Sequence, residues 1–292
     1  MQLKYTGMIP PMVVPFTAEG EIDEGAFRSE ARYLLDHRIH GISVGGSTGE
    51  GALLSDQELR RTLEILQEEN RKKIPVFAGI IRNSTREAIR CAKDAEALGA
   101  DVLLVTPVFY HGATEEGNYA YFKAIADAVP LPIVIYNVVA TNIISPELFL
   151  RIAEIEEVIG VKQVDPIKLA ELAVMVRPGT HVYSACDQML YGTYVSGACG
   201  SISALVTIAP QLCLDQWDAY LRGDQAEASE IQKKMVPIVR SYLQPPFPGK
   251  VKELINLQGR SGGLGRMPNT GPDDRRRRMM REALRGARLL KE

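Results

Sequence analysis

The sequence lacks the features typical of several large classes of protein. Its four cysteines, Cys91, Cys186, Cys199 and Cys213, form no C-x-x-C pair and have no nearby His-x-x-x-His, so neither a zinc site nor a disulfide framework is indicated. No apolar run reaches the roughly 18 residues of a membrane span. The first residues also lack the charged and apolar segments of a signal peptide. We therefore expect a cytoplasmic protein with no membrane partner and no metal site.

Neither an excess of positive charge nor a nucleotide-binding loop is present. The formal net charge is -2, and binding to a phosphate backbone usually leaves a basic excess, so we expect no nucleic-acid partner. The patterns G-x-G-x-x-G and G-x-x-x-x-G-K are absent. The one basic run, 275–278, follows Pro272 and two aspartates, which is typical of a first helical turn. We interpret it as a solvated helix face, with an anion site as the less favoured alternative.

Short apolar runs alternate regularly with helical segments along the chain of 292 residues. Helix start signals occur at Ser55 and Ser84, which both read as capping boxes, and a stop signal occurs at Gly99. Strands that are apolar throughout favour a closed parallel barrel over an open sheet. We therefore predict a (β/α)8 TIM barrel over residues 1–222 and a C-terminal helical extension over 223–292. The predicted strands are 8–16, 41–45, 74–80, 101–106, 131–137, 158–162, 181–184 and 200–203; the predicted extension helices lie near 225–243, 247–257 and 272–290.

Active sites of such barrels lie at the carboxyl ends of the strands, and three sequence features fall there. Lys162 ends the sixth predicted strand, VIGVK. An amine among apolar side chains loses solvation of its charged form, which favours the neutral amine that attacks a carbonyl. A lysine that merely reaches out of the barrel mouth is the equal alternative. Tyr136 ends the fifth strand, where a phenol can move protons or simply pack.

The third feature is the turn GGSTGEG, residues 45–51, after the second predicted strand. Its backbone amides and the hydroxyls of Ser47 and Thr48 can converge on an anion, and a carboxylate fits such a turn as well as a phosphate does. Taken alone, a turn of this composition is more often a simple loop.

Taken together, the segments GGSTGE, VTPVFY, IYNV and GVKQ resemble the signature segments of the class I pyruvate-type aldolases related to N-acetylneuraminate lyase and dihydrodipicolinate synthase. The resemblance covers nearly the whole chain. It implies a (β/α)8 barrel with a C-terminal helical extension, an assembly that is usually a tetramer, and chemistry without a metal or organic cofactor.

The resemblance also implies roles for individual residues. Lys162 would form the Schiff base, Tyr136 would act as general acid and base, and Ser47 would relay protons to Tyr136. Thr48 and the amides around Gly46 would hold the carboxylate of a 2-oxo acid. Tyr110 would complete the proton relay of a neighbouring subunit, so that the dimers of a homotetramer share it.

Departures from the family pattern concern the other half of the substrate. Thr141 stands where dihydrodipicolinate synthases have the arginine that grips a second carboxylate, so lysine biosynthesis is not expected. Val164, Gln188 and Ala204 replace residues with which N-acetylneuraminate lyases read sugar hydroxyls. The side chains left to face the distal part of the substrate are Gln163, Asp187 and Ser203.

We therefore expect a lyase that cleaves or forms a carbon–carbon bond of a 2-keto-3-deoxy sugar acid or a 4-hydroxy-2-oxo acid, with pyruvate as product or donor. A dehydratase of a 2-keto-3-deoxy sugar acid is the alternative that uses the same imine. A non-catalytic protein that binds 2-oxo acids is the alternative from another class, and the intact lysine, tyrosine and Ser-Thr pair argue against it.

Overall fold

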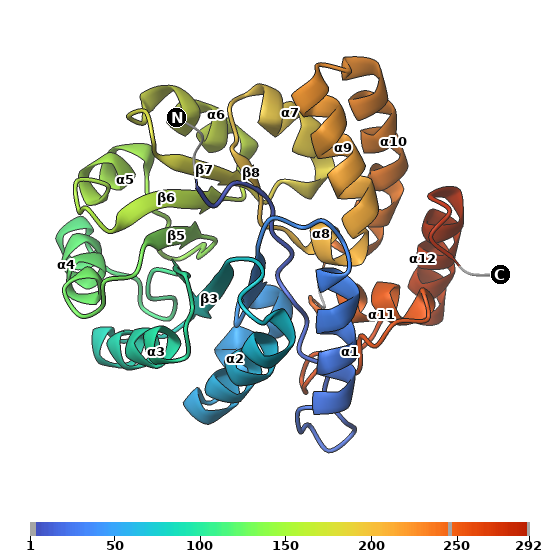
Figure 1. Ribbon diagram of the computed structural model, residues 1–292, viewed down its shortest axis with the longest axis horizontal. Coiled ribbons are helices and arrows are strands. Elements are labelled where there is room, and N and C mark those ends of the chain that lie inside the picture. Colours follow the sequence, from blue (N-terminus) through green and yellow to red (C-terminus); the bar gives the residue numbers. More distant parts are fainter. Residues whose placement is uncertain (1–3, 245–246, 291–292) are drawn as a thin grey trace.

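Eight parallel strands form the centre of the molecule, and helices lie around them (Figure 1). The structure is a computed structural model that describes residues 4–244 and 247–290. Each of the first seven strands is followed by a helix that leads to the next strand, as predicted for a (β/α)8 barrel. The strands are β1 Gly7–Met8, β2 Ile42–Val44, β3 Val76–Ile80, β4 Val102–Val105, β5 Ile133–Asn137, β6 Val158–Gln163, β7 His181–Ser184 and β8 Gly200–Ser201.

The sheet closes on itself between its first two strands. The strands follow the order β1-β8-β7-β6-β5-β4-β3-β2, and a parallel bridge between Pro11 and Ser43 joins the two ends. The predicted first strand, 8–16, is wrong in length, because regular pairing stops at Met8. Pro10 and Pro11 have no N–H to donate. Beyond Ile9, the ladder continues through the carbonyl of Pro10, which accepts from the N–H of Ser43, and through the N–H of Met12, which donates to the Ser43 carbonyl (2.7 Å).

Strand side chains are buried on both faces of the barrel, which explains why the strands are apolar throughout. In β4, Leu104 points into the barrel with Phe77 and Val134, whereas Leu103 and Val105 pack under the surrounding helices. Neither face of the wall therefore meets solvent.

The surrounding helices begin where capping residues predict. Ser55 forms a reciprocal capping box with Glu58. Ser84 also caps its helix, but the Glu87 carboxylate accepts from the Ser84 hydroxyl instead of bonding the backbone, so the second predicted box is only half formed. The helices are α1 Glu24–Leu35, α2 Asp56–Asn70, α3 Thr85–Ala97, α4 Glu115–Ala126, α5 Pro146–Ile152, α6 Pro166–Met175, α7 Leu190–Val195, α8 Ala204–Ile208 and α9 Pro210–Arg222.

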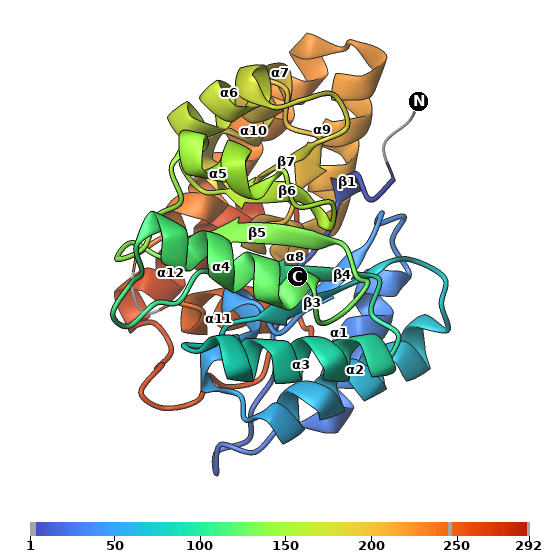
Figure 2. The same ribbon diagram turned by 90° about the vertical axis from the view of Figure 1, so that its left-hand side faces the viewer.

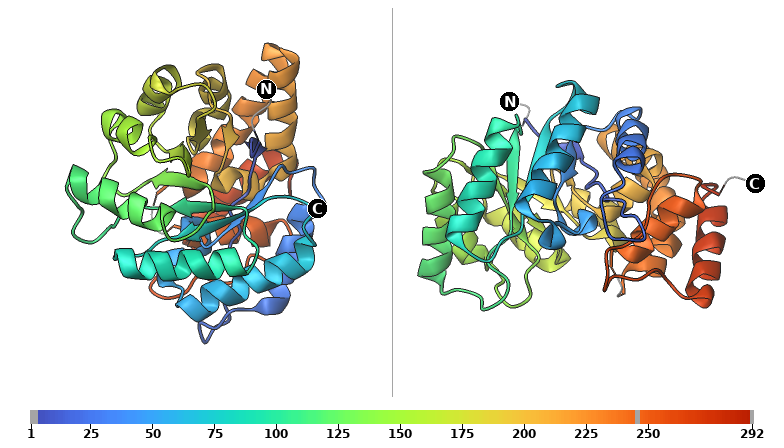
Figure 3. Two further views of the ribbon diagram at one scale, coloured as in Figure 1. Left: turned by 60° about the vertical axis from the view of Figure 1, so that its left-hand side comes forward. Right: turned by 90° about the horizontal axis from the view of Figure 1, so that it is seen from below.

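The C-terminal helices gather on one side of the barrel (Figures 2 and 3). They are α10 Gln225–Tyr242, α11 Gly249–Leu257 and α12 Asp274–Gly286. Helix α10 packs against α9 and against the short 3-10 helix η3, Asp187–Met189, which follows β7. In the basic run, Arg277 pairs with Glu253 of α11 (2.6 Å). The division of the chain at residues 222 and 223 stays a prediction. No helix in the described part of the chain is long and apolar enough to cross a membrane.

One buried ion pair connects the C-terminal extension to the turn after β2. The carboxylate of Glu50 and the ammonium of Lys252, in α11, lie 2.5 Å apart, and both side chains are almost fully buried. Lys252 also donates to the carbonyls of Val14 (2.6 Å) and Leu264 (2.7 Å), so each of its protons has an acceptor. Burial lowers the pKa of Lys252 to about 8, against the opposing attraction of Glu50. The turn is thus held from the far end of the chain.

Removing one partner of this pair would leave the other charge buried and unpaired. We expect Lys252→Met to lower the free energy of unfolding by about 3–5 kcal/mol, measured by urea unfolding followed by circular dichroism. Lys233→Met is the matched control, because the Lys233–Glu230 pair is exposed and such pairs contribute at most about 1 kcal/mol. Equal losses in the two variants would contradict a special role for the Glu50–Lys252 pair.

Candidate active site

The pairing of β5 with β6 brings Lys162 and Tyr136 together. Their Cα atoms are direct partners in the parallel ladder, so both side chains lie on the same face of the sheet. The Nζ atom of Lys162 lies 3.7 Å from the centre of the Tyr136 ring. Lys162 is only 3% exposed. The lysine therefore stays inside the barrel mouth, which removes the alternative that it merely reaches out into solvent.

Tyr136 is linked in turn to the segment after β2. Its hydroxyl donates to Oγ of Ser47 at 3.1 Å, across 89 positions of sequence. Ser47 is placed there by a sharp bend at Gly45, whose φ of +78° suits glycine. A Cβ atom at Gly45 would also lie 2.8 Å from the carbonyl oxygen of Gly79. Lys162, Tyr136 and Ser47 thus form one contiguous group from three strand ends.

The turn after Gly45 contains the short 3-10 helix η1, Ser47–Gly49, with Thr48 buried. The N–H groups of Gly49 and Gly51 donate to the carbonyl of Gly46, and that of Glu50 donates to the carbonyl of Ser47. The first N–H groups of a helix have no partner within it. The N–H groups of Ser47 and Thr48 are therefore the ones that suit a carboxylate.

A second polar group lies at the ends of β6, β7 and β8. Asp187 and Ser203 are buried, and neither Oδ1 of Asp187 nor Oγ of Ser203 has a hydrogen-bond partner among the described residues. The same holds for Nε2 of Gln163, although its Oε1 accepts from the N–H of Val164 (2.9 Å). Buried polar atoms without partners are rare, so these three suit a polar ligand.

The carboxyl of Asp187 has an unusual environment. Burial raises its pKa above the ordinary value, while the nearby hydroxyls of Ser203 and Tyr242 and the charge of Lys162 act in the opposite direction. The hydroxyl of Tyr242, from α10, donates to Oδ2 of Asp187. The C-terminal extension therefore also fixes this side of the site.

Tyr110 does not reach the site of its own chain. It lies in the loop after β4, and 74% of its surface is exposed. Its backbone N–H donates to Oδ1 of Asn83 (3.0 Å), which fixes the loop, and its ring contacts the ring of the neighbouring His111 (4.5 Å between centroids). Among the described residues, no group of three or more His, Cys, Asp or Glu side chains is arranged to hold a metal ion.

Comparison with known proteins agrees with this geometry. The sequence profile of the Dihydrodipicolinate synthetase family matches residues 4–287. The chain is 34% identical to the 4-hydroxy-tetrahydrodipicolinate synthase of Rhodospirillum centenum over 284 residues, which covers 96% of this chain and 97% of that protein. It is 31% identical to the synthase of Methanopyrus kandleri, with 100% and 99% of the two chains covered. The chain belongs to the dihydrodipicolinate synthetase family.

Solved structures of this family have the same fold. Dihydrodipicolinate synthase from Aquifex aeolicus superimposes with a TM-score of 0.93 at 28% identity, covering 99% of this chain and 100% of that one. A prophage protein of the family from E. coli K12, solved in complex with pyruvate, gives a TM-score of 0.92 at 28% identity over 98% and 99% of the chains. As a family member, this protein is a lyase of the class I aldolase type, which works through a pyruvate Schiff base.

The residues that hold the candidate active site in place were not predicted from the sequence. Glu50 was visible only as part of a turn, and Lys252 lies 202 positions away. Asn137 follows Tyr136 and bonds both the N–H (2.9 Å) and the carbonyl (2.8 Å) of Ile144, which closes the loop after β5. The one sequence feature that pointed to Asn137 was its place as a polar residue at the end of the apolar run IVIYN. A buried polar side chain at such a position needs hydrogen-bond partners inside the protein.

The raised pKa of Asp187 predicts a pH-dependent stability. Below the usual pKa of 3.8 the carboxyl is neutral in the folded and unfolded states. Between this value and the higher pKa of the folded state, only the folded protein keeps the proton, so the free energy of unfolding falls as the pH rises through this range. We expect Asp187→Asn, which cannot ionise, to melt at a higher temperature than the parent at pH 7 and to lose this advantage as the pH falls toward 4.

Thermal unfolding across this pH range measures the difference, with Asp36→Asn at the exposed end of α1 as control. The control should follow the parent at every pH. An advantage of Asp187→Asn that grows toward acid pH would contradict the account.

Proposed function

We propose that Lys162 forms a Schiff base with the C2 carbonyl of a 2-oxo acid and that the protein thereby cleaves or forms the C3–C4 bond, with pyruvate as product or donor. The observation that carries this proposal is the buried amine of Lys162 against the ring of Tyr136 (3.7 Å), whose hydroxyl donates to Ser47 (3.1 Å). A nucleophile, an acid and base, and a relay hydroxyl are thus in contact.

The chemistry of these groups accounts for the reaction. The amine adds to C2, and the C2 oxygen leaves as water with the proton of the Tyr136 hydroxyl, which gives a protonated imine and the Tyr136 phenolate. Tyr136, as its phenolate, takes the proton of the C4 hydroxyl; the C4 carbonyl forms, the C3–C4 bond breaks and its electron pair moves into the imine to give an enamine. The Tyr136 hydroxyl then returns the proton to C3, and water releases pyruvate and restores the amine. The reverse sequence forms the bond.

The turn after β2 supports the binding of pyruvate. The N–H groups of Ser47 and Thr48, next to Gly46, and the Thr48 hydroxyl would hold the substrate carboxylate. This places the carboxylate beside the relay and C2 toward Lys162. Such preorganised donors need no rearrangement when the substrate binds.

The second half of the substrate differs from that of the synthases among the relatives. Thr141 lies where those synthases are expected to carry an arginine, and its hydroxyl donates to the Phe109 carbonyl (2.7 Å). It therefore has no charge and no free proton for a second carboxylate. We propose a 2-keto-3-deoxy sugar acid or a 4-hydroxy-2-oxo acid as substrate, with Gln163, Asp187 and Ser203 toward its hydroxyls.

A dehydratase that uses the same imine is the second candidate. The observation in its favour is Asp187, whose raised pKa and unpartnered Oδ1 suit a group that protonates a departing hydroxyl. Removal of a C3 proton from the imine would give the enamine, and the C4 hydroxyl would then leave as water with the proton of Asp187. The carbon chain stays intact, so no pyruvate would appear.

We also propose that the protein assembles as a homotetramer of dimers that share Tyr110. Its exposed ring (74%) and the exposed Ile143 (50%) lie on loops that Thr141 and Phe109 bond together. Exposed aromatic and aliphatic side chains on two loops that a hydrogen bond holds together are typical of a surface that contacts another subunit. The cytoplasmic location stays a prediction.

Trapping the imine tests the proposed function. Incubation with pyruvate and borohydride should add one pyruvyl group per chain, located on Lys162 by peptide mass spectrometry. Lys162→Ala should give no adduct, whereas Lys168→Ala, a partly exposed lysine of α6, should react like the parent. Tyr136→Phe should still form the imine, with turnover lowered about 100-fold.

Absence of the adduct in the parent at saturating pyruvate, or an adduct on another lysine, would overturn the proposal. Where the adduct forms, 2-keto-3-deoxy acids and 4-hydroxy-2-oxo acids decide between the two candidates. An aldolase releases pyruvate from them, and a dehydratase does not.

A further inference from the structure

A cavity of about 410 Å³ opens beside Ser47 at the barrel mouth. Its size falls near the lower end of the range for small-molecule sites, about 300–1,000 Å³. Its walls come from the segments after β2, β3, β4 and β5 and from two segments of the C-terminal extension. The side chains that dominate these walls are apolar: Leu53, Phe109, Val138, Val139 and Phe247. Because Ser47 accepts from Tyr136, this cavity adjoins the reacting group.

The polar side chains that line the cavity are already engaged. Glu50 is the one charged residue among the described lining residues, and its carboxylate accepts from Lys252 (2.5 Å) and from Nδ2 of Asn269 (2.9 Å). The hydroxyl of Thr106 donates to the carbonyl of Ile80 (3.4 Å). Among the lining residues that the structure describes, none is Lys, Arg or His.

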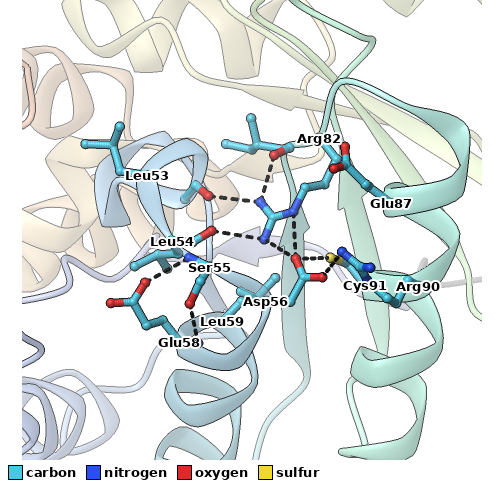
Figure 4. A network of polar contacts seen from close by, with 12 residues as sticks. Leu53, Leu54, Ser55, Asp56, Glu58, Leu59, Arg82, Glu87, Arg90 and Cys91 are labelled. Atoms are coloured by element: carbon cyan, nitrogen blue, oxygen red, sulfur yellow. Dashed lines mark hydrogen bonds and ion pairs between the residues drawn. The ribbon is translucent and has the colours of Figure 1, made fainter.

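Two arginines that bond the wall of this cavity are also held by protein acceptors. Figure 4 shows Arg82, which donates to the carbonyls of Gly51 (3.2 Å) and Leu54 (3.2 Å) and to the carboxylate of Asp56 (3.1 Å). Arg266 donates to the carbonyls of Leu53 (3.0 Å) and Gly20 (2.9 Å) and to the Glu58 carboxylate. These bonds hold the segment after β2 as a fixed wall, and they engage the guanidinium groups of both Arg82 and Arg266 with protein acceptors.

We infer that this cavity binds an uncharged, apolar tail on the aldehyde half of the substrate; the inference rests on the proposed function. A carboxylate placed there would lose water without gaining a partner. In this cavity the hydroxyls of a sugar tail would remain unpaired as well, because Gln163, Asp187 and Ser203, which are proposed to face substrate hydroxyls, lie outside its lining. Of the two proposed substrate classes, the cavity therefore selects 4-hydroxy-2-oxo acids with a short alkyl or aryl tail.

The test uses the condensation reaction at saturating pyruvate with three aldehydes of equal chain length. Butanal carries an apolar tail, succinic semialdehyde ends in a carboxylate, and erythrose carries hydroxyls. We expect kcat/KM for butanal to exceed the other two values by about ten- to a hundredfold. Equal or higher values for succinic semialdehyde or erythrose would overturn the inference.

A variant pair locates the tail. Val138→Lys places a cation in the cavity and should shift the ratio of kcat/KM from butanal toward succinic semialdehyde by about tenfold or more. Val174→Lys, the same substitution on α6 at a residue that is 85% exposed and lies outside the cavity, should leave the ratio unchanged. An equal ratio in both variants would show that the tail binds elsewhere. If Val138→Lys does not fold, the comparison of the three aldehydes with the parent protein still tests the inference.

The borohydride adduct, measured without any aldehyde, separates this inference from the proposed function. If the parent forms the pyruvyl adduct and a charged or hydroxylated aldehyde reacts best, the inference fails and the proposed function stands. If no adduct forms, the proposed function fails and the inference falls with it.

Discussion

The buried pair of Glu50 and Lys252 joins the two parts of the chain on which the site depends. Glu50 has a left-handed backbone (φ of 56°) between two short 3-10 helices, a conformation that costs a residue with a side chain about 1–2 kcal/mol. The ammonium of Lys252 offsets this cost because it donates to the Glu50 carboxylate, and Nδ2 of Asn269 donates to the same carboxylate. Glu50 belongs to the turn proposed to hold the pyruvate carboxylate, and it also lines the cavity beside Ser47. One interaction therefore supports both halves of the proposed substrate site.

The same dependence explains why an enzyme of this kind retains its C-terminal helices. Helix α11 supplies Lys252, and α10 supplies Tyr242, which donates to Asp187. Asp187 is kept buried with one oxygen unpartnered, an arrangement that lowers stability at neutral pH. Unfavourable burial of this sort is typical of functional sites, where it prepares a group for the reaction. The extension thus fixes the barrel mouth at two places, after β2 and after β7.

Local sequence patterns were sufficient to predict much of this arrangement. The strands that carry Tyr136 and Lys162 were predicted to within two residues at each end, because unbroken apolar runs with clear stop signals specify parallel strands. The first strand was predicted too long, since its valines outweighed Pro10 and Pro11, which cannot donate to a ladder. The contact between Glu50 and Lys252 could not be predicted, because nothing local relates residues 202 positions apart. The apolar cavity was missed for the same reason, as its walls come from distant segments.

The most direct test of the account is a crystal structure of the protein after reaction with pyruvate and borohydride. A Schiff base on Lys162 predicts continuous density from Nζ of Lys162 to C2 of the pyruvyl group, with the carboxylate at the N–H groups of Ser47 and Thr48 and the Tyr136 hydroxyl beside C2. Density that joins pyruvate to another lysine, or a carboxylate directed away from this turn, would contradict it.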